Sequence, residues 1–199
     1  NKIHYVNHGP GQRERGVVLV ITLILVVILS LLGTFAIRNA TQTERSVNGI
    51  RSTEVAREAA ETALRFCEQV AIFDGNDKDY TEYGESGVRA KIIATTIASE
   101  ADEAGAWRDA TNWTSSSNNL IKVPEGYYKK DIDGNTAAAQ LKHDPLCLIQ
   151  KIESTSTPKL AGYLITARGF ANNADFKPET GKASQGAESG MQSVLTRGS

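Results

Sequence analysis

The sequence predicts an α+β protein in which one long N-terminal helix packs on a small antiparallel β-sheet. Three observations predict this fold: an uncharged apolar run over residues 17–37, a helical pattern that continues to residue 73, and three β-rich segments in the C-terminal third. A length of 199 residues suits one soluble domain with an anchor. We therefore expect an anchored chain with a single head.

Residues 17–37 form a candidate transmembrane helix. The run reads VVLVITLILVVILSLLGTFAI and holds no charged residue and no proline. As a helix it reaches about 31 Å, close to the roughly 30 Å hydrocarbon core of a bilayer. Sixteen of its 21 residues are Val, Leu, Ile or Phe, which favours insertion by roughly 5–10 kcal/mol. We expect Thr22, Ser30 and Thr34 to return their hydroxyls to the helix backbone.

Several fates are open to such a run. It fits a buried helix of a soluble protein, a cleaved secretory signal, a plain signal anchor, or an anchor trimmed on its cytoplasmic side. A secretory signal has a shorter apolar region, of about 7–15 residues, before a small-x-small cleavage site, and Thr34–Ala36 make a poor site of that kind. The preceding residues 12–16 read QRERG, so a short polar segment ends in Gly16 directly before the run.

The helical pattern continues beyond the apolar run as an amphipathic helix. No proline interrupts residues 38–73, and Gly33 or Gly49 permits a hinge because glycine weakens a helix. We expect the helix to end near Phe73, before the DGNDKD run in which Gly75 suits a helix end. The apolar stripe of the amphipathic part consists of Val47, Ile50, Val55, Ala59, Thr62, Phe66, Val70 and Phe73.

The string RGVVLVITLILVVILSLLGTFAIRNATQTERSVNGIRSTEVAREAAETAL, which begins at Arg15, resembles the N-terminal region of PilX-type minor pilins of type IV pili. The resemblance covers residues 12 to about 68. It implies a type IV pilin-like fold, prepilin peptidase cleavage between Gly16 and Val17, and N-methylation of Val17. It also places the chain in the bacterial inner membrane as a single-pass protein with its head in the periplasm. The basic residues on the two sides of the span do not by themselves decide this orientation.

The resemblance divides the chain into four parts. They are a leader peptide (1–16), a transmembrane half of the long helix (17–37), an amphipathic periplasmic half (38–73) and a globular α+β head (74–199). The first residue is Asn1 rather than methionine, so we expect the true start of the leader to lie upstream.

Ile21 departs from the usual pilin pattern. Major pilins and most minor ones carry a glutamate five residues into the mature chain, and this chain has Ile21 there, as many PilX-like proteins and the type II secretion pseudopilin GspK do. The family's glutamate is thought to meet the terminal amine of a neighbouring subunit in an apolar environment, where a lone charge is costly. A subunit with Ile21 suits the distal end of the filament, where no earlier subunit presents an amine.

The resemblance implies a minor pilin in type IV pilus assembly, within a priming or tip complex of the fimbrium, with cell adhesion as an associated role. The expected partners are other minor pilins, the major pilin, prepilin peptidase, the inner-membrane assembly platform and membrane lipid. Two alternatives are a GspK-like pseudopilin and a signal-anchored extracytoplasmic binding module that never polymerises. The 22 basic and 23 acidic residues nearly balance, so we expect no nucleic-acid binding by the bulk of the domain.

The predicted head contains three strand-like segments, residues 146–152, 162–170 and 191–196, which suggest a three-stranded antiparallel sheet. Residues 88–99 fit a strand or a helix. Four aromatic residues lie in a loop-like stretch that either packs on the core or binds a partner: Trp107, Trp113, Tyr127 and Tyr128.

Cys67 lies on the predicted helix and Cys147 on the first predicted strand. A helix packed on a sheet brings such residues near each other, and outside the cytoplasm a disulfide would be stable. It would enclose 79 intervening residues and contribute about 2–4 kcal/mol. Two buried thiols are the alternative.

The sequence offers no motif for catalysis, so we expect neither enzyme activity nor a cofactor. His4 and His8 precede Gly16, which leaves His143 as the single histidine of a trimmed chain. The Asp131, Asp133, Asn135 trio resembles the start of a calcium loop, but Thr136 and Lys142 stand where that loop needs Gly and Glu. We expect a solvated turn there, and likewise in the acidic run over residues 74–79.

Overall fold

The computed structural model describes residues 15–73, 87–128, 141–155, 159 and 161–197. The chain divides into two compact units, residues 1–48 and 49–199. The first unit holds only helix in its described part, and the second holds the end of that helix together with a β-sheet. Each unit is described by itself below.

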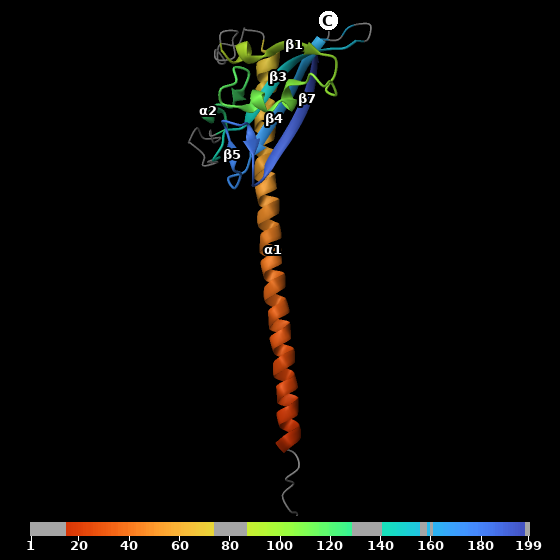
Figure 1. Cartoon of the computed structure of the whole chain (residues 1–199), viewed down its shortest axis with the longest axis vertical. Helices are drawn as coiled ribbons and strands as arrows, with labels where there is room; N and C mark the ends of the chain where they lie inside the picture. The colour runs from red at the N-terminus through yellow and green to blue at the C-terminus, as the bar shows by residue number, and fades with distance from the viewer. Residues whose placement is uncertain (1–14, 74–86, 129–140, 156–158, 160, 198–199) are drawn as a thin grey trace, which may run out of the picture. The chain divides into compact units, whose positions relative to one another are not determined.

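One helix, α1, spans Arg15–Ile72 (Figure 1). The helical hydrogen bonding continues through Gly33 and Gly49, so neither glycine divides α1 into two separate helices. Both glycines lie where an added Cβ would meet nothing within 4 Å, and the local cost of glycine is small against the sum of helical hydrogen bonds on either side. The helix ends one residue before the predicted Phe73, while Gly75 and the DGNDKD run lie outside the described residues.

The α+β fold class is confirmed, and so are the three predicted strands. They correspond to β3 (Leu146–Glu153), β4 (Ala161–Phe170) and β7 (Glu188–Arg197). β4 pairs antiparallel with both neighbours, with ten consecutive residue pairs between β4 and β7. This continuous register fixes which side chains of the three strands share a face.

The sheet is larger than predicted and is not wholly antiparallel. Within the described residues the strand order is β1-β3-β4-β7, and a short β2 (Ile121–Lys122) also pairs with β3. β1 (Ile93–Ile97) runs parallel to β3. The ambiguous residues 88–99 therefore contain both structures, because a 3₁₀ turn (Val88–Lys91) leads into β1. The three predicted strands pair antiparallel as expected. The sheet differs from the prediction by the addition of β1, whose parallel pairing with β3 requires a long crossover connection.

The remaining described elements are short. Two 3₁₀ turns, Ala106–Arg108 and Ala110–Trp113, lie in the segment between β1 and β2. A single turn of helix, α2 (Glu125–Tyr128), follows β2. β5 (Phe176–Lys177) and β6 (Lys182–Ala183) form a two-stranded ribbon between β4 and β7.

The C-terminal turns of α1 lie against one face of the sheet (Figure 1). Phe66 and Val70 are fully buried there against Ile149 and Ile165. The alternation along a strand puts Cys147, Ile149, Ile165 and Ala167 on this helix-covered face. Burial of this apolar surface is the main force that joins helix and sheet.

The helix face that packs on the sheet is richer in alanine than the predicted stripe. Of that stripe, Ala59, Phe66 and Val70 are buried, whereas Val47 and Ile50 are 56% and 67% exposed. The buried face begins at Ala56 and includes Ala59, Ala60, Ala63, Phe66, Cys67, Val70 and Ala71. Apolar periodicity alone does not show where along a helix its partner begins.

Gly169 on β4 lies at a close approach of the sheet to the helix. A Cβ on Gly169 would overlap the Ala60 nitrogen, the Ala56 oxygen and the Ala59 carbonyl carbon. The alanines present only methyl groups, and the glycine presents none, so the two backbones come together directly.

The opposite face of the sheet is covered by the segment between β1 and β2. Gln150 on β3 is buried, yet its amide is satisfied: its Oε1 accepts from the Ala106 nitrogen at 2.8 Å, and its Nε2 donates to the Thr95 oxygen at 3.1 Å. Trp113, Leu146, Leu148, Phe170 and Phe176 form an apolar cluster beside it. Since both faces of β3 are covered, its sequence reads as nearly continuous apolar residues.

We expect Gly169→Ala to destabilise the head, because the new methyl group has no room against α1. Overpacking of this kind costs about 1–3 kcal/mol. Gly190→Ala on the neighbouring β7 is the matched control, since its Cβ would meet only the Ala167 oxygen at 3.9 Å. Urea unfolding of the full chain in detergent measures both. Equal stability of the two variants would contradict the close approach.

Candidate functional site

The apolar surface of α1 over residues 17–37 has no cover from the described residues of the chain. No residue of the most apolar window is buried, and Ile37 is 69% exposed. The helix is long and apolar enough to cross a membrane. A contiguous apolar surface of this size requires lipid or other apolar helices around it.

The polar residues within this surface are internally satisfied, as predicted. The Thr22 hydroxyl donates to the Leu19 oxygen at 2.9 Å, and the Ser30 hydroxyl donates to the Val26 oxygen at 2.8 Å. Thr34 likewise donates to the Ser30 oxygen at 2.9 Å. These bonds remove the main cost of placing hydroxyl groups in hydrocarbon.

Gly16, Val17 and Ile21 lie at the beginning of α1. An added Cβ on Gly16 would meet nothing within 4 Å, and Val17 is 61% exposed. The first turn carries no acidic residue, so no carboxylate there offsets the positive end of the helix dipole. Ile21 lies one turn after Val17 and is 51% exposed. Processing at Gly16 and Val17 stays a prediction, because the geometry shows access but not cleavage.

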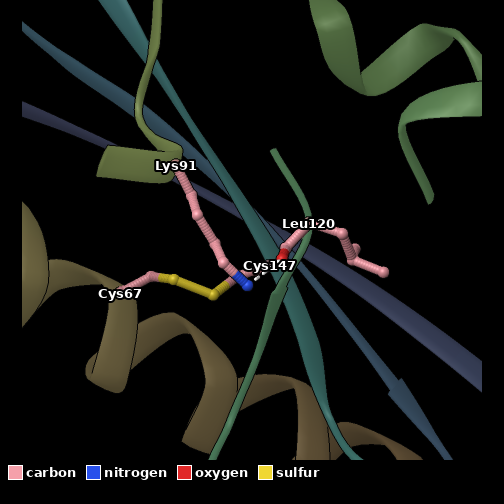
Figure 2. The surroundings of a disulfide bond; sticks show 4 residues. All are labelled: Cys67, Lys91, Leu120 and Cys147. Atoms are coloured by element: carbon pink, nitrogen blue, oxygen red, sulfur yellow. Dashed lines mark hydrogen bonds between the residues drawn. A yellow bond between two sulfur atoms is a disulfide. The ribbon is translucent and has the colours of Figure 1, made fainter. Parts of the chain in front are cut away.

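Cys67 on α1 and Cys147 on β3 are joined by a disulfide (Figure 2). Their Cα atoms are 6.6 Å apart, and both residues are fully buried. The bond ties the last turns of α1 to the centre of the sheet. Lys91 lies beside it and donates from Nζ to the Leu120 oxygen at 3.1 Å (Figure 2).

Arg89 terminates α1 from a different segment. Its Nη1 lies 2.8 Å from the Val70 oxygen, 3.1 Å from the Ala71 oxygen and 2.9 Å from the Phe73 oxygen. The last turn of α1 has no basic residue of its own, so Arg89 supplies the cation that a helix C-terminus favours. Sequence reasoning missed this role, because a contact across 16 or more residues leaves no local pattern.

The four aromatic residues of the predicted loop pack onto the core. Trp113 is 3% exposed and donates from Nε1 to the Trp107 oxygen at 2.9 Å. The Tyr127 hydroxyl lies 3.1 Å from the Gln69 Oε1 on α1. Tyr128 donates to the Asp144 Oδ1 at 2.8 Å, and burial together with this bond raises the pKa of Tyr128. These contacts favour the structural interpretation for Trp113, Tyr127 and Tyr128, whereas Trp107 keeps part of its surface in contact with solvent.

Asp102 accepts hydrogen bonds within the segment that covers part of the sheet face opposite α1. Its carboxylate accepts from the Ala104 nitrogen at 3.0 Å and from the Ala98 nitrogen at 3.1 Å, and these bonds lower the pKa of Asp102. Arg108 donates from Nε to the Asp102 backbone oxygen at 3.2 Å. The segment is thus held in one conformation by local polar contacts.

The structure brings no metal-binding cluster together in its described part, where no group of three or more His, Cys, Asp or Glu side chains converges. Asp131, Asp133 and Asn135, the acidic run 74–79 and the N-terminal histidines lie outside that part. His143 packs edge-on against the rings of Phe170 and Phe176, with centroids 6.0 and 5.8 Å away. The absence of enzyme activity stays a prediction.

Comparison with known proteins identifies one part of the chain. Residues 15–65 match the family model described as PilX N-terminal. No curated protein and no solved structure matches the chain. The matched segment contains the exposed apolar surface of α1 over residues 17–37 and the first turns that pack on the sheet.

We expect loss of the disulfide to lower the free energy of unfolding by about 2–4 kcal/mol, because the reduced unfolded chain gains conformational freedom. Cys67→Ala and Cys147→Ala each test this by urea unfolding of the full chain in detergent. The double variant is the control and should cost little more than either single one. Finding both thiols free in denaturant before any reduction would contradict the bridge.

Proposed function

We propose that this chain, which carries a PilX-type pilin N-terminal region, is a minor pilin that takes part in type IV pilus assembly. One observation carries the proposal: the segment that matches the PilX N-terminal model contains an apolar helix surface that none of the described residues covers. The chain needs no catalytic activity for this role.

The exposed helix suits two environments in turn. In the inner membrane, Val17–Ile37 would lie in lipid as a single span, with the head in the periplasm. In a fibre, the same surface would pack on the apolar helices of other subunits, and the exchange costs little because lipid chains and leucine side chains are equally apolar. Proposed partners are therefore other minor pilins, the major pilin, the inner-membrane assembly platform and membrane lipid.

Prepilin peptidase would act between Gly16 and Val17. Glycine leaves the scissile peptide uncovered by a side chain, and the open space around Gly16 supports access. Cleavage would leave Val17 as the first residue, and methylation of its amine would follow. The new terminal charge would lie at the positive end of α1, where the described first turn provides no acidic residue.

Ile21 supports a place at the tip or in a priming complex. An exposed isoleucine there offers no carboxylate to the terminal amine of a neighbouring subunit. In an apolar fibre core, an unpaired amine is costly. The chain therefore suits the first position of a filament better than a position along the shaft. At the first position, no earlier subunit presents an amine that needs a carboxylate.

We expect the chain from cells that contain prepilin peptidase to begin at Val17, with one added methyl group, and the chain from cells without it to keep its leader. Intact mass and N-terminal sequencing of the membrane protein measure this. Gly16→Val should block trimming because its side chain covers the scissile bond, while Gly33→Val in the same helix should not. An untrimmed chain in both kinds of cell would end the pilin proposal and favour the signal-anchored binding module.

We expect the unmodified chain at filament ends and Ile21→Glu at increased levels along the shaft, because the new carboxylate can pair with a neighbour's amine. Labelled subunits counted along isolated pili measure the distribution. Ile24→Glu is the matched control, since it adds the same charge to the exposed span one turn away. Uniform incorporation of the unmodified chain along the shaft would exclude the tip assignment. Recovery in secretion pseudopili instead of pili would favour the GspK-like alternative.

A further inference from the structure

The face of the sheet opposite α1 carries an open groove of about 560 Å³. Its floor is formed by β4 and β7, and one wall is formed by the segment between β1 and β2 with Trp107 and Arg108. The size lies in the range of small-ligand sites. The groove belongs entirely to the head and contains none of the residues of the apolar helix surface.

Arg168 on β4 forms a rigid part of the groove. It pairs with Glu188, and its Nη1 donates to the Gly181 oxygen at 2.8 Å. Its guanidinium carbon lies 4.8 Å from the centre of the Trp113 ring. A guanidinium held by a carboxylate, a carbonyl and an indole loses little further freedom when a ligand contacts it.

Gly190 keeps the groove open above Arg168. The two residues are direct partners across β4 and β7. A Cβ on Gly190 would meet only the Ala167 oxygen at 3.9 Å, whereas Gly162 and Gly169 in the same sheet have backbone atoms in that place. Packing therefore does not require glycine at 190, and a mid-strand glycine without a packing reason is typical of a place where a ligand approaches the backbone.

The groove is positively charged although the chain is not. Its lining includes Arg108, Arg168 and Lys182 against Glu188, three positive charges and one negative charge, which gives a net charge of +2. The whole chain has a net charge of −1. A concentration of positive charge in a concave surface favours an anionic ligand.

The uncharged lining groups narrow the chemistry of that ligand. Gln192 on β7 donates from Nε2 to the Thr166 Oγ1 at 2.9 Å, so an amide and a hydroxyl lie together on the floor. The Trp107 wall is apolar, and the Arg108 guanidinium carbon lies 4.5 Å from the centre of its ring. A sugar acid combines the three matching features: a carboxylate, hydroxyl groups and an apolar ring face.

We propose that this groove binds a hexuronic acid unit of an anionic polysaccharide. The carboxylate would meet Arg108 and Lys182, the hydroxyls would meet Gln192 and Thr166, and the ring would lie over Gly190 against Trp107. A short acidic peptide offers the carboxylate without a hydroxyl-bearing ring, so it matches fewer of these groups. The inference stands apart from filament assembly.

Intrinsic fluorescence reports directly on the groove, because the two tryptophans of the chain, Trp107 and Trp113, both line it. The full chain in detergent is titrated with trigalacturonate, with its uncharged methyl ester and with triglutamate. We expect a saturable change in emission with trigalacturonate and a Kd of about 1 mM or tighter. Added salt should weaken this binding. The ester and triglutamate should bind at least about tenfold more weakly, because each lacks one of the matching features.

Gly190→Leu should weaken trigalacturonate binding by at least about tenfold without lowering the unfolding midpoint, because it fills the groove and displaces no packed atom. Gly126→Leu is the control outside the groove, since an added Cβ there would meet nothing within 4 Å and one on Gly190 would meet only the Ala167 oxygen at 3.9 Å. Arg108→Gln, which removes a charge from the wall and changes no residue of the sheet, should weaken binding about fivefold, and Arg65→Gln on the exposed side of α1 should not.

Three results would overturn the proposal. The first is no saturable change with trigalacturonate up to about 10 mM. The second is wild-type affinity in both Gly190→Leu and Arg108→Gln. The third is triglutamate binding as tightly as trigalacturonate, which would assign the groove to an acidic peptide.

Discussion

The head depends on the direct approach of α1 to β4. At Gly169 the sheet presents no side chain, and Ala56, Ala59 and Ala60 present only methyl groups. This approach sets the depth at which Phe66 and Val70 enter the core against Ile149 and Ile165. Van der Waals contact falls off steeply with separation, so a gap of even half an ångström would weaken every contact along this interface. The disulfide at Cys67 and the Arg89 cap on the Val70 and Ala71 oxygens hold the later turns of the same helix.

The two ends of α1 differ in how much of their surface is buried, although both are helical. Toward its C-terminus the helix buries a narrow stripe, and the small alanine side chains of that stripe allow the helix to approach the sheet closely. Toward its N-terminus it buries nothing against the described residues, and the hydroxyls of Thr22, Ser30 and Thr34 donate to the helix backbone so that the outside remains apolar. The first arrangement specifies one partner, the sheet. The second suits any apolar surrounding, which is the property that a subunit needs if it is to leave lipid for a fibre.

The two faces of the sheet also differ in kind. The helix-covered face is apolar and closed. The opposite face has buried parts, such as Gln150 with its satisfied amide, and an open part where Arg168, Glu188 and Gly190 lie together. Charge that is nearly balanced over the chain is thus unevenly distributed in space, and the proposed binding groove of the head is separate from the helix surface proposed for assembly.

The sequence by itself determined the long helix, the apolar span and the three strands β3, β4 and β7, because each has a local period or composition. For the disulfide it determined only the possible partners, because the chain has two cysteines. It did not determine that Val47 and Ile50 stay exposed, that β1 joins the sheet in parallel, or that Arg89 caps α1. Nor did it show that Gly169 is needed for packing while Gly190 is not. These features depend on contacts between distant segments, and only the tertiary structure decides which segments meet.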